Sequence, residues 1–435
     1  MIAEFERING KPCACGREHF VPLKVYSGKG AVEELIGAVR GYGAKKVFLL
    51  FDKTTFRVAG ERVEKMLSAA SISVLGCVLP ESPEPDEMSV GYAVMCFDAD
   101  CDAVVAVGSG VVNDTAKIVA AAANKPYMIV ATAPSMDGYA SATSSMVRSG
   151  LKITLKSKCP DVIIGDTDIL ATAPDKMLTA GLGDMLAKYV SICEWRISNV
   201  INGEYYCENI AALVRASLKK CIDNKEGLLK REDAAIEAVF EGLVVCGAAM
   251  AFAGISRPAS GGEHYMSHIW DMRGLAFGEP VSLHGIQCAL GTYICAGLYD
   301  NIRKITPDRE KALAYVKNFD YAKYTGSLRA FLGKSAEAMI ELEKKEKKYD
   351  VALHAKRLEV IISNWDKIQA IIDEELPHAD EIKSILDTIG APSSMAEIGL
   401  GDDILPMTFF ASKDMRDKYV LSRLCFDLGI IEEMI

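Results

Sequence analysis

Four short runs rich in apolar residues lie in the first third of this 435-residue chain. They span residues 45–51, 73–78, 103–107 and 127–131, and the segments between them carry helix-forming residues. Short apolar runs that alternate with helical segments are typical of a parallel β-sheet covered by helices. Because two of the runs are nearly all apolar, we expect their strands to be buried on both faces.

The strand-like runs stop after about residue 172, and long helical patterns fill the rest of the chain. The clearest candidate helices are residues 174–197, 204–221 and 232–255. The apolar stretch Gly242–Ile255 is too short to cross a bilayer, so we predict a buried helix there. The sequence thus predicts two domains, a Rossmann-like α/β domain over residues 1–172 and an all-α domain over residues 173–435.

Charge and composition exclude several classes of protein. Half of the residues are hydrophobic and 25% are charged, which is typical of a globular chain. With 49 Lys and Arg against 59 Asp and Glu, the net charge of -10 argues against nucleic acid or a membrane surface as partner. The N-terminus lacks the basic and apolar regions of a secretory signal, so we expect a cytoplasmic protein with a small-molecule partner.

The 13 cysteines are scattered, as expected for reduced thiols rather than a disulfide framework. One local cluster, Cys13-Ala-Cys15-Gly-Arg17-Glu-His19, resembles half of a zinc site. Zinc sites generally need four ligands, and no second cysteine pair lies at a suitable spacing. We therefore interpret the cluster as an N-terminal turn.

A glycine-rich segment follows the third apolar run and opens a helical stretch. Its backbone N–H groups could point at a phosphate in the field of the helix N-terminus. Asn113 occupies the place of the third Rossmann glycine, so the fingerprint is incomplete and a plain tight turn is the alternative. The segment consists of Gly108, Ser109, Gly110, Val111, Val112, Asn113 and Asp114.

Two further segments lie where parallel strands would end. Asp52 follows the first run, where its carboxylate could accept hydrogen bonds from ribose hydroxyls or cap a helix, with equal support for each role. Because this acid precedes the glycine turn instead of following it by about 20 residues, a dinucleotide fold would be a variant. The Thr132–Ser141 segment follows the fourth run, and this position favours a binding loop over a structural turn.

Three of the six histidines fall close together in the sequence, at His264, His268 and His284. His264 and His268 share one face of a predicted helix, which lets both meet one metal ion or one substrate; core or interface histidines are the alternative. Asp184, inside an apolar helical pattern, is the best candidate for a carboxylate ligand. Lys188, one turn further on, could instead neutralise Asp184.

These segments together resemble the sn-glycerol-1-phosphate dehydrogenase family, within the superfamily of metal-dependent polyol dehydrogenases and dehydroquinate synthase-like proteins. The resemblance covers nearly the whole chain. Its most specific pieces are Pro134–Ser141 and Ser256–His268. The others are the Cys-x-Cys-Gly-Arg-x-His start, the Gly108 turn, Gly181–Lys188, His284-Gly285 and Asp427-Leu-Gly429.

The resemblance implies an NAD(P) site, one divalent metal and a substrate site. The metal ligands would be Asp184, His264 and His284, and Asp137, Asp184 and His268 would face the substrate. The cofactor-binding residues would be Asp52, Gly108, Gly110, Val111, Val112, Asn113, Asp114, Thr132, Ala133, Pro134, Ser135 and Ser141.

The activity implied is reduction of dihydroxyacetone phosphate to sn-glycerol 1-phosphate, a reaction of phospholipid biosynthesis, by a homodimer that uses zinc or nickel. Iron-type relatives carry a histidine ligand where this chain has Lys188, which argues against iron. Lys188 and then Arg257 are the candidates to bind the substrate phosphate, with ion pairs as their alternative roles. A polyol dehydrogenase acting on an unphosphorylated substrate and a lyase like dehydroquinate synthase remain alternative functions.

Overall fold

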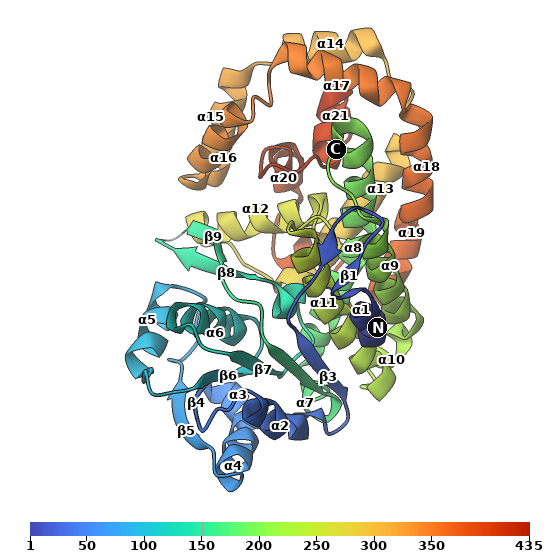
Figure 1. Ribbon diagram of the computed structural model, residues 1–435. Helices are drawn as coiled ribbons and strands as arrows, with labels where there is room; N and C mark the ends of the chain where they lie inside the picture. Colours follow the sequence, from blue (N-terminus) through green and yellow to red (C-terminus); the bar gives the residue numbers. More distant parts are fainter. Residues whose placement is uncertain (150) are drawn as a thin grey trace. The chain divides into compact units, whose positions relative to one another are not determined.

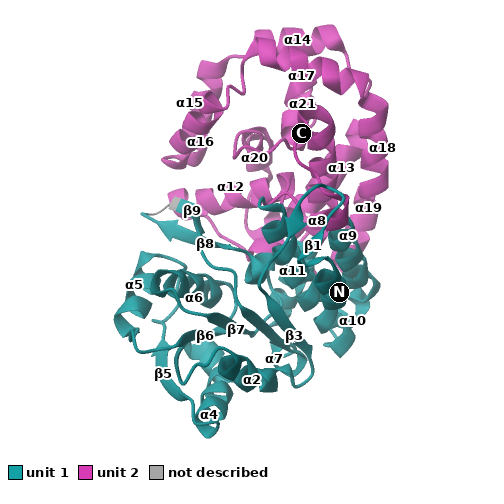
Figure 2. Cartoon of the chain, viewed as in Figure 1, with its two compact units in different colours: residues 1–185, 212–255 teal, residues 186–211, 256–435 magenta. Residues whose placement is uncertain are grey.

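The chain forms two compact units in the computed structural model, which describes residues 1–149 and 151–435 (Figures 1 and 2). Unit 1 comprises residues 1–185 and 212–255, and unit 2 comprises residues 186–211 and 256–435. The units therefore do not follow the boundary expected at residue 172. The physical reason is α11 (Asp233–Ala253), which packs against sheet elements of unit 1.

Unit 1 is built on a six-stranded parallel sheet with the strand order β3-β10-β7-β6-β4-β5. All four strands predicted from the apolar runs are confirmed, and β3 and β10 were not predicted. The strands are β3 (Lys24–Gly28), β4 (Lys46–Phe51), β5 (Ser73–Val78), β6 (Ala103–Gly108), β7 (Tyr127–Ala131) and β10 (Val162–Asp166).

Helices cover both faces of this sheet, as the nearly all-apolar strands predict (Figure 1). On one face, side chains of α2 (Glu34–Gly41) and α4 (Glu61–Ala69) join one core cluster with alternate residues of the central strands. On the other, α6 (Gly110–Ala123) packs along β6 and β7 and buries residues that include Val112, Ala116 and Val119.

The strand order has a switch point between β4 and β6. From β4 the chain passes to β5 on one side, and after α5 (Glu87–Cys96) it returns to β6 on the other side of β4. Open α/β sheets bind ligands beside such a point, at the carboxyl ends of the strands. Because all six strands are parallel, the loops after β4, β6 and β7 leave at that same edge.

Smaller elements complete unit 1. Two antiparallel hairpins, β1–β2 and β8–β9, were not predicted. The remaining bounds are β1 (Lys11–Pro12), β2 (Glu18–His19), β8 (Thr143–Arg148), β9 (Leu151–Lys156), α1 (Ile2–Ile8), η1 (Ala31–Glu33), α3 (Lys53–Thr55), η2 (Phe56–Gly60), η3 (Asp137–Ala140), α7 (Thr167–Leu170) and α10 (Lys225–Leu228).

The described residues of unit 2 contain helices and no strand, which confirms the all-α prediction for the later part of the chain. α8 (Asp175–Asn202) and α9 (Glu208–Asp223) each contribute residues to both units. The other helices are α12 (Gly262–Phe277), α13 (His284–Ile302), α14 (Arg309–Lys317), α15 (Tyr321–Leu332), α16 (Ser335–Lys345), α17 (Val351–Ser363), α18 (Trp365–Glu375), α19 (Ala379–Thr388), η4 (Ala396–Ile398), η5 (Asp402–Ile404), α20 (Leu405–Ser412), α21 (Leu421–Asp427) and η6 (Ile431–Glu433).

α11 confirms the predicted buried helix. It is the one helix among the described residues that is long and apolar enough to cross a membrane, but 83% of its most apolar 18-residue stretch is buried inside the protein. Phe240 on this helix fills the space beside β10, where a Cβ on Gly165 would lie 2.0 Å from its ring. These contacts are those of a core helix that supports the sheet.

Candidate functional site

Three predicted binding segments meet at the carboxyl edge of the sheet in unit 1. Asp52 follows β4, Ser109 follows β6 and Thr132 follows β7, and these three strands are neighbours. The Thr132 amide donates a hydrogen bond of 3.1 Å to the Gly108 carbonyl, which joins the second and third segments. The switch point thus lies between Asp52 and the glycine turn.

The two glycines of the turn, Gly108 and Gly110, differ in the space around them. A Cβ on Gly108 would lie only 2.5 Å from Cβ of Val112, so glycine is needed there for the close packing of strand and helix. A Cβ on Gly110 would meet no atom within 4 Å, so the space beside the first turn of α6 is open. An anion in that space could approach the backbone N–H groups at the N-terminus of a 14-residue helix.

Val112 and Asn113 are buried, so their contribution to a cofactor site would come from the backbone. The Asn113 side chain accepts a 2.9 Å hydrogen bond from the Tyr127 hydroxyl. Asp114 accepts a hydrogen bond from the Ser145 amide at 3.2 Å, and burial raises the pKa of its carboxyl to about 6. The side chains of Asn113 and Asp114 therefore fasten the turn to its neighbours.

Lys117 is a site residue that the sequence analysis missed. Its buried ammonium group donates to the Ser141 hydroxyl at 3.1 Å, to the Thr143 carbonyl at 3.2 Å and to the Gly138 carbonyl. Burial lowers the pKa of Lys117. A single lysine in the apolar stretch after Asn113 was the available signal, and the structure shows that it organises the end of the Thr132–Ser141 loop.

Asp52 caps α3. Its Oδ1 accepts hydrogen bonds from the Thr54 amide at 2.7 Å and the Thr55 amide at 2.8 Å, while the Asp52 amide donates to the Thr55 hydroxyl. The capping alternative is therefore confirmed. Both capping bonds go to Oδ1. A ribose hydroxyl could donate to Oδ2 of the same carboxylate, so the cap and a ribose contact are compatible.

Glycines also let two helices approach the Thr132–Ser141 loop. A Cβ on Gly181 of α8 would lie 1.8 Å from the Pro134 carbonyl oxygen, and one on Gly247 of α11 would lie 2.7 Å from the Asp137 carbonyl oxygen. α8 and α11 therefore press directly against the backbone of this loop. Asp184, three residues after Gly181, is fully buried.

Asp184 is tied to the same loop. Its Oδ2 accepts a 2.8 Å hydrogen bond from the Asp137 amide. The bond fixes the direction of the Asp184 carboxylate and holds residue 137, which is itself buried. The structure thus brings together two of the acids that the sequence analysis selected, both within unit 1.

The three selected histidines gather in unit 2, where α12 carries His264 and His268 and α13 begins at His284. The ring centroids of His264 and His284 are 4.9 Å apart, and those of His268 and His284 are 5.8 Å apart. The predicted cluster is therefore present in the structure.

His264 is oriented by its neighbour in the sequence. Its Nδ1 lies 2.7 Å from Oε1 of the fully buried Glu263, which also accepts from the Gly261 amide. An Nδ1–H that donates to a carboxylate leaves Nε2 as the metal-binding atom. Burial raises the pKa of Glu263, and burial together with the nearby Glu263 charge raises the pKa of Glu194. Glu263 was missed, although an acid directly before a candidate ligand was a visible signal.

A second chain of hydrogen bonds orients His284. The Ser267 hydroxyl donates to Gln287 Oε1 at 2.7 Å, and Ser267 Oγ lies 3.0 Å from His284 Nδ1. Because a hydroxyl has one hydrogen, Ser267 Oγ accepts from the Nδ1–H of His284, which puts the lone pair of this ring on Nε2.

Ligand atoms of His264, His284 and Cys288 lie within 4.8 Å of one another, and the Cys288 sulfur is 3.5 Å from His284 Nε2. Imidazole nitrogens with a nearby thiol suit zinc or nickel, so the residues present fit a divalent metal. Cys288 was not selected from the sequence. His268, Asp271 and His284 form a second such group, again within 4.8 Å.

The two basic candidates for phosphate binding differ. Lys188 is buried and its ammonium group donates to the Ala259 carbonyl at 2.9 Å. The Arg257 guanidinium instead pairs with Glu204, at 2.7 Å for the shortest bond, and donates to the Tyr419 carbonyl at 2.8 Å. Arg257 thus has the ion-pair role expected as its alternative, with a buried guanidinium and a partly exposed Glu204 carboxylate.

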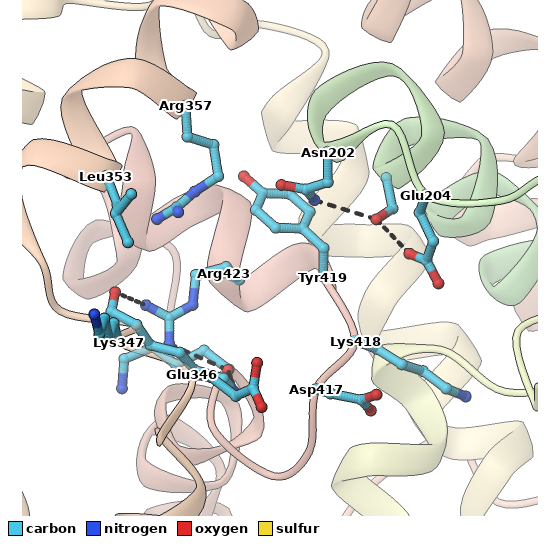
Figure 3. A pocket seen from close by; sticks show the side chains of 13 residues that line it. Asn202, Glu204, Glu346, Lys347, Leu353, Arg357, Asp417, Lys418, Tyr419 and Arg423 are labelled. Atoms are coloured by element: carbon cyan, nitrogen blue, oxygen red, sulfur yellow. Dashed lines mark hydrogen bonds between the residues drawn. The ribbon is translucent and has the colours of Figure 1, made fainter. Parts of the chain in front are cut away.

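A cavity of about 280 Å³ lies in unit 2, beside the Glu204 and Tyr419 partners of Arg257 (Figure 3). Its described lining residues include none of the three clustered histidines. They are Ser198, Asn202, Glu204, Glu346, Lys347, Lys348, Leu353, Arg357, Lys413, Asp417, Lys418, Tyr419 and Arg423. The histidine cluster is therefore the better candidate for the reaction site.

Several curated proteins similar in sequence are named as dehydrogenases. A family model described as iron-containing alcohol dehydrogenase matches residues 26–174. Glycerol-1-phosphate dehydrogenase [NAD(P)+] of Halalkalibacterium halodurans is 28% identical over 94% of each chain. The protein of the same name from Bacillus licheniformis is 34% identical over 67% of this chain and 74% of its own, and that from Methanosarcina mazei is 32% identical over 65% and 79%.

Solved structures share the fold. Glycerol dehydrogenase from Schizosaccharomyces pombe matches with a TM-score of 0.62 at 17% identity, covering 94% of this chain and 89% of its own. Sulfoacetaldehyde reductase from Bifidobacterium kashiwanohense, solved in complex with NAD+, matches with a TM-score of 0.59 at 16% identity over 95% and 97%.

Proposed function

Since the chain belongs to the glycerol-1-phosphate dehydrogenase family of oxidoreductases, we propose that it reduces dihydroxyacetone phosphate to sn-glycerol 1-phosphate with NADH or NADPH, and catalyses the reverse reaction. The observation that carries the proposal is the group of His264, His284 and Cys288, whose ligand atoms lie within 4.8 Å of one another, close enough to hold one metal ion. In the reaction the cofactor gives a hydride to the carbonyl carbon, and the carbonyl oxygen gains a proton.

We propose that Asp184 joins His264 and His284 as a metal ligand. A buried carboxylate held by the Asp137 amide presents an oxygen donor of fixed direction, and α8 runs on from Asp184 into unit 2. A divalent ion held there would polarise the substrate carbonyl as a Lewis acid and stabilise negative charge on its oxygen. Zinc or nickel is the proposed metal, because the position one turn beyond Asp184 holds Lys188 rather than a further histidine ligand.

The carboxyl edge of the sheet is the proposed NAD(P) site. The open space at Gly110 would take the cofactor diphosphate against the backbone of Val111, Val112, Asn113 and Asp114, and Asp52 would accept from the adenosine ribose. Thr132, Ala133, Pro134, Ser135 and Ser141 would line the nicotinamide side. Lys117 shapes that loop and Gly108 lets α6 pack against β6.

We assign the substrate contacts to Asp137, His268 and Lys188. His268 is the proposed proton carrier, because its ring lies 5.8 Å from that of His284, and imidazole can gain and lose a proton near neutral pH. Lys188 is the proposed phosphate anchor, and its buried ammonium supplies the local positive charge that an acidic protein needs for an anionic substrate.

The decisive experiment is an NADH-oxidation assay with dihydroxyacetone phosphate, after metal is removed and zinc or nickel is restored separately. We expect turnover only with metal, and faster turnover with the phosphorylated ketone than with dihydroxyacetone. Equal rates on both ketones would favour a polyol dehydrogenase, and turnover without net NADH consumption would favour a lyase. A cytoplasmic homodimer is part of the proposal, and light scattering on the purified chain checks the dimer.

A further inference from the structure

The N-terminal hairpin of unit 1 brings together two cysteines and a histidine that the proposed reaction does not use. β1 and β2 pair antiparallel, with Lys11 opposite His19. The Gly16 amide donates to the Cys13 carbonyl at 2.9 Å, and Gly16 has a φ of 82°, a left-handed conformation that glycine adopts without strain. The tight turn therefore places Cys13, Cys15 and His19 on one small loop.

The donor atoms of these three residues have the spacing of a metal site. One ligand atom from each lies within 4.8 Å of the others, and the Cys15 sulfur is 3.4 Å from His19 Nε2. Zinc bonds of about 2.3 Å to sulfur and about 2.0 Å to nitrogen, at a tetrahedral angle, put S and N roughly 3.5 Å apart. A thiol–imidazole hydrogen bond alone would explain Cys15 and His19 but not the position of Cys13.

The imidazole of His19 is held in the tautomer that binds metal. Its Nδ1 lies 3.3 Å from the Phe252 carbonyl oxygen near the end of α11. A carbonyl oxygen can only accept, so Nδ1 carries the hydrogen and the Nε2 lone pair faces the Cys15 sulfur. Histidine ligands of metals are commonly fixed in this way, by a bond from the other ring nitrogen to a backbone carbonyl.

The surroundings also favour a closed site. His19 is 1% exposed, and its ring lies 5.6 Å from the Phe252 ring, which stacks on Phe5 at 5.3 Å. Water is therefore largely excluded from the histidine side of the cluster. Two thiolates and one neutral imidazole would balance the charge of a divalent cation there.

We propose that Cys13, Cys15 and His19 bind a structural zinc ion that fastens the N-terminal hairpin to the C-terminal end of α11. α11 ends at Ala253, and the segment that carries His264 follows it in the chain. The zinc ion thus holds the helix end from which the metal-binding segment starts. It takes no part in hydride transfer, so the inference stands independently of the proposed reaction.

A tetrahedral zinc ion takes four ligands, and Cys13, Cys15 and His19 supply three of them. The sequence argued against a zinc site because no second cysteine pair lies at a suitable spacing. The structure shows that one hairpin by itself brings three donors together.

The first test separates this metal from the proposed catalytic one. We would measure zinc in the untagged full-length His264→Ala/His284→Ala variant and expect one equivalent per chain. Adding Cys13→Ser and Cys15→Ser should remove it, whereas Cys96→Ser, another partly buried cysteine of unit 1, should leave it in place. No zinc in the histidine variant, or zinc retained without Cys13 and Cys15, would overturn the proposal. A metal content equal in wild type and the histidine variant would instead count against the proposed catalytic ligands.

A second test needs no substitution. Zinc-bound thiolates resist alkylation, so Cys13 and Cys15 of the wild-type protein should react with iodoacetamide only after a chelator is added, with peptide mass spectrometry as the readout. Cys96 should react equally in both conditions. Equal labelling of Cys13 and Cys15 with and without chelator, or a disulfide between them, would overturn the zinc site.

Discussion

The sheet edge of unit 1 and the histidine cluster of unit 2 are candidate sites built in opposite ways. At the sheet edge the useful groups are backbone amides and open space, and the side chains of Asn113, Asp114 and Lys117 hold the backbone in place. In the histidine cluster the useful groups are side-chain nitrogens, and Glu263 and Ser267 orient them. Substitutions at the sheet edge should act by changing the packing of the backbone and the space for a cofactor. Substitutions in the histidine cluster should act by changing metal binding and proton transfer.

The largest effect is expected at the second site. His284→Ala should lose metal and lower activity by more than about 100-fold, because removing a ligand costs more than removing the group that orients it. His268→Ala should keep its metal and lose rate only. Metal analysis alongside kcat checks both, and equal metal loss in the two variants would contradict the division between ligand and proton carrier.

Glu263→Gln should weaken metal binding by roughly 10- to 100-fold, because the amide keeps the shape of the carboxylate but not its charge. Competition with a chelator measures the affinity. Glu343→Gln is the matched control, since Glu343 is also a buried glutamate of unit 2. If both variants bind metal as wild type does, the Glu263–His264 contact is only structural.

Lys188→Met should raise KM for dihydroxyacetone phosphate by a factor that corresponds to about 1–3 kcal/mol of lost binding free energy. The rise in KM for dihydroxyacetone should be much smaller. The substitution keeps the apolar stem and removes the charge. Steady-state kinetics on both ketones checks the difference. An equal loss on both would mean that Lys188 acts through its bond to the Ala259 carbonyl and not through the phosphate.

The paired substitutions Gly108→Ala and Gly110→Ala test shape at the sheet edge. Gly108→Ala should destabilise the fold by roughly 1–3 kcal/mol, because the new Cβ would overlap Val112. Gly110→Ala should leave the unfolding midpoint nearly unchanged and raise KM for NADH, because its Cβ would enter the open space. Denaturant unfolding and cofactor kinetics separate the two outcomes, and a normal KM in Gly110→Ala would argue against a diphosphate there.

The smallest effect is expected for Asp52→Ala. Loss of the α3 cap should cost about 1 kcal/mol of stability. Loss of the carboxylate should also narrow any preference for NAD over NADP, because a carboxylate repels the 2′-phosphate. If the ratio of the two kcat/KM values is unchanged, Asp52 serves only as a cap.

Much of the fold could be predicted because local pattern and environment agree. The inner strands β4, β6 and β7 are nearly all apolar and were predicted, and so was the edge strand β5. The other edge strand, β3, is half-buried and its residues do not form an apolar run, and the inner strand β10 was missed because its apolar run, residues 162–164, is very short. The β1–β2 hairpin has two-residue strands that leave no periodicity to detect. Residues 212–255 were assigned to the helical half because helical pattern does not reveal which unit a helix packs against.

The sequence by itself determined the types of side chain available: a glycine turn after a strand, three clustered histidines, an acid within an apolar helix, and a Cys-x-Cys-Gly-Arg-x-His start. The tertiary structure decided their orientation and partners. In the folded chain Arg257 pairs with Glu204, and Asp52 caps α3. Glu263 contacts Nδ1 of His264, and Ser267 contacts Nδ1 of His284. Nδ1 of His19 lies against the Phe252 carbonyl oxygen. The physical reason is that a hydrogen bond requires two groups at about 3 Å in a fixed direction, and residues as far apart as 19 and 252 reach that geometry only after the chain has folded.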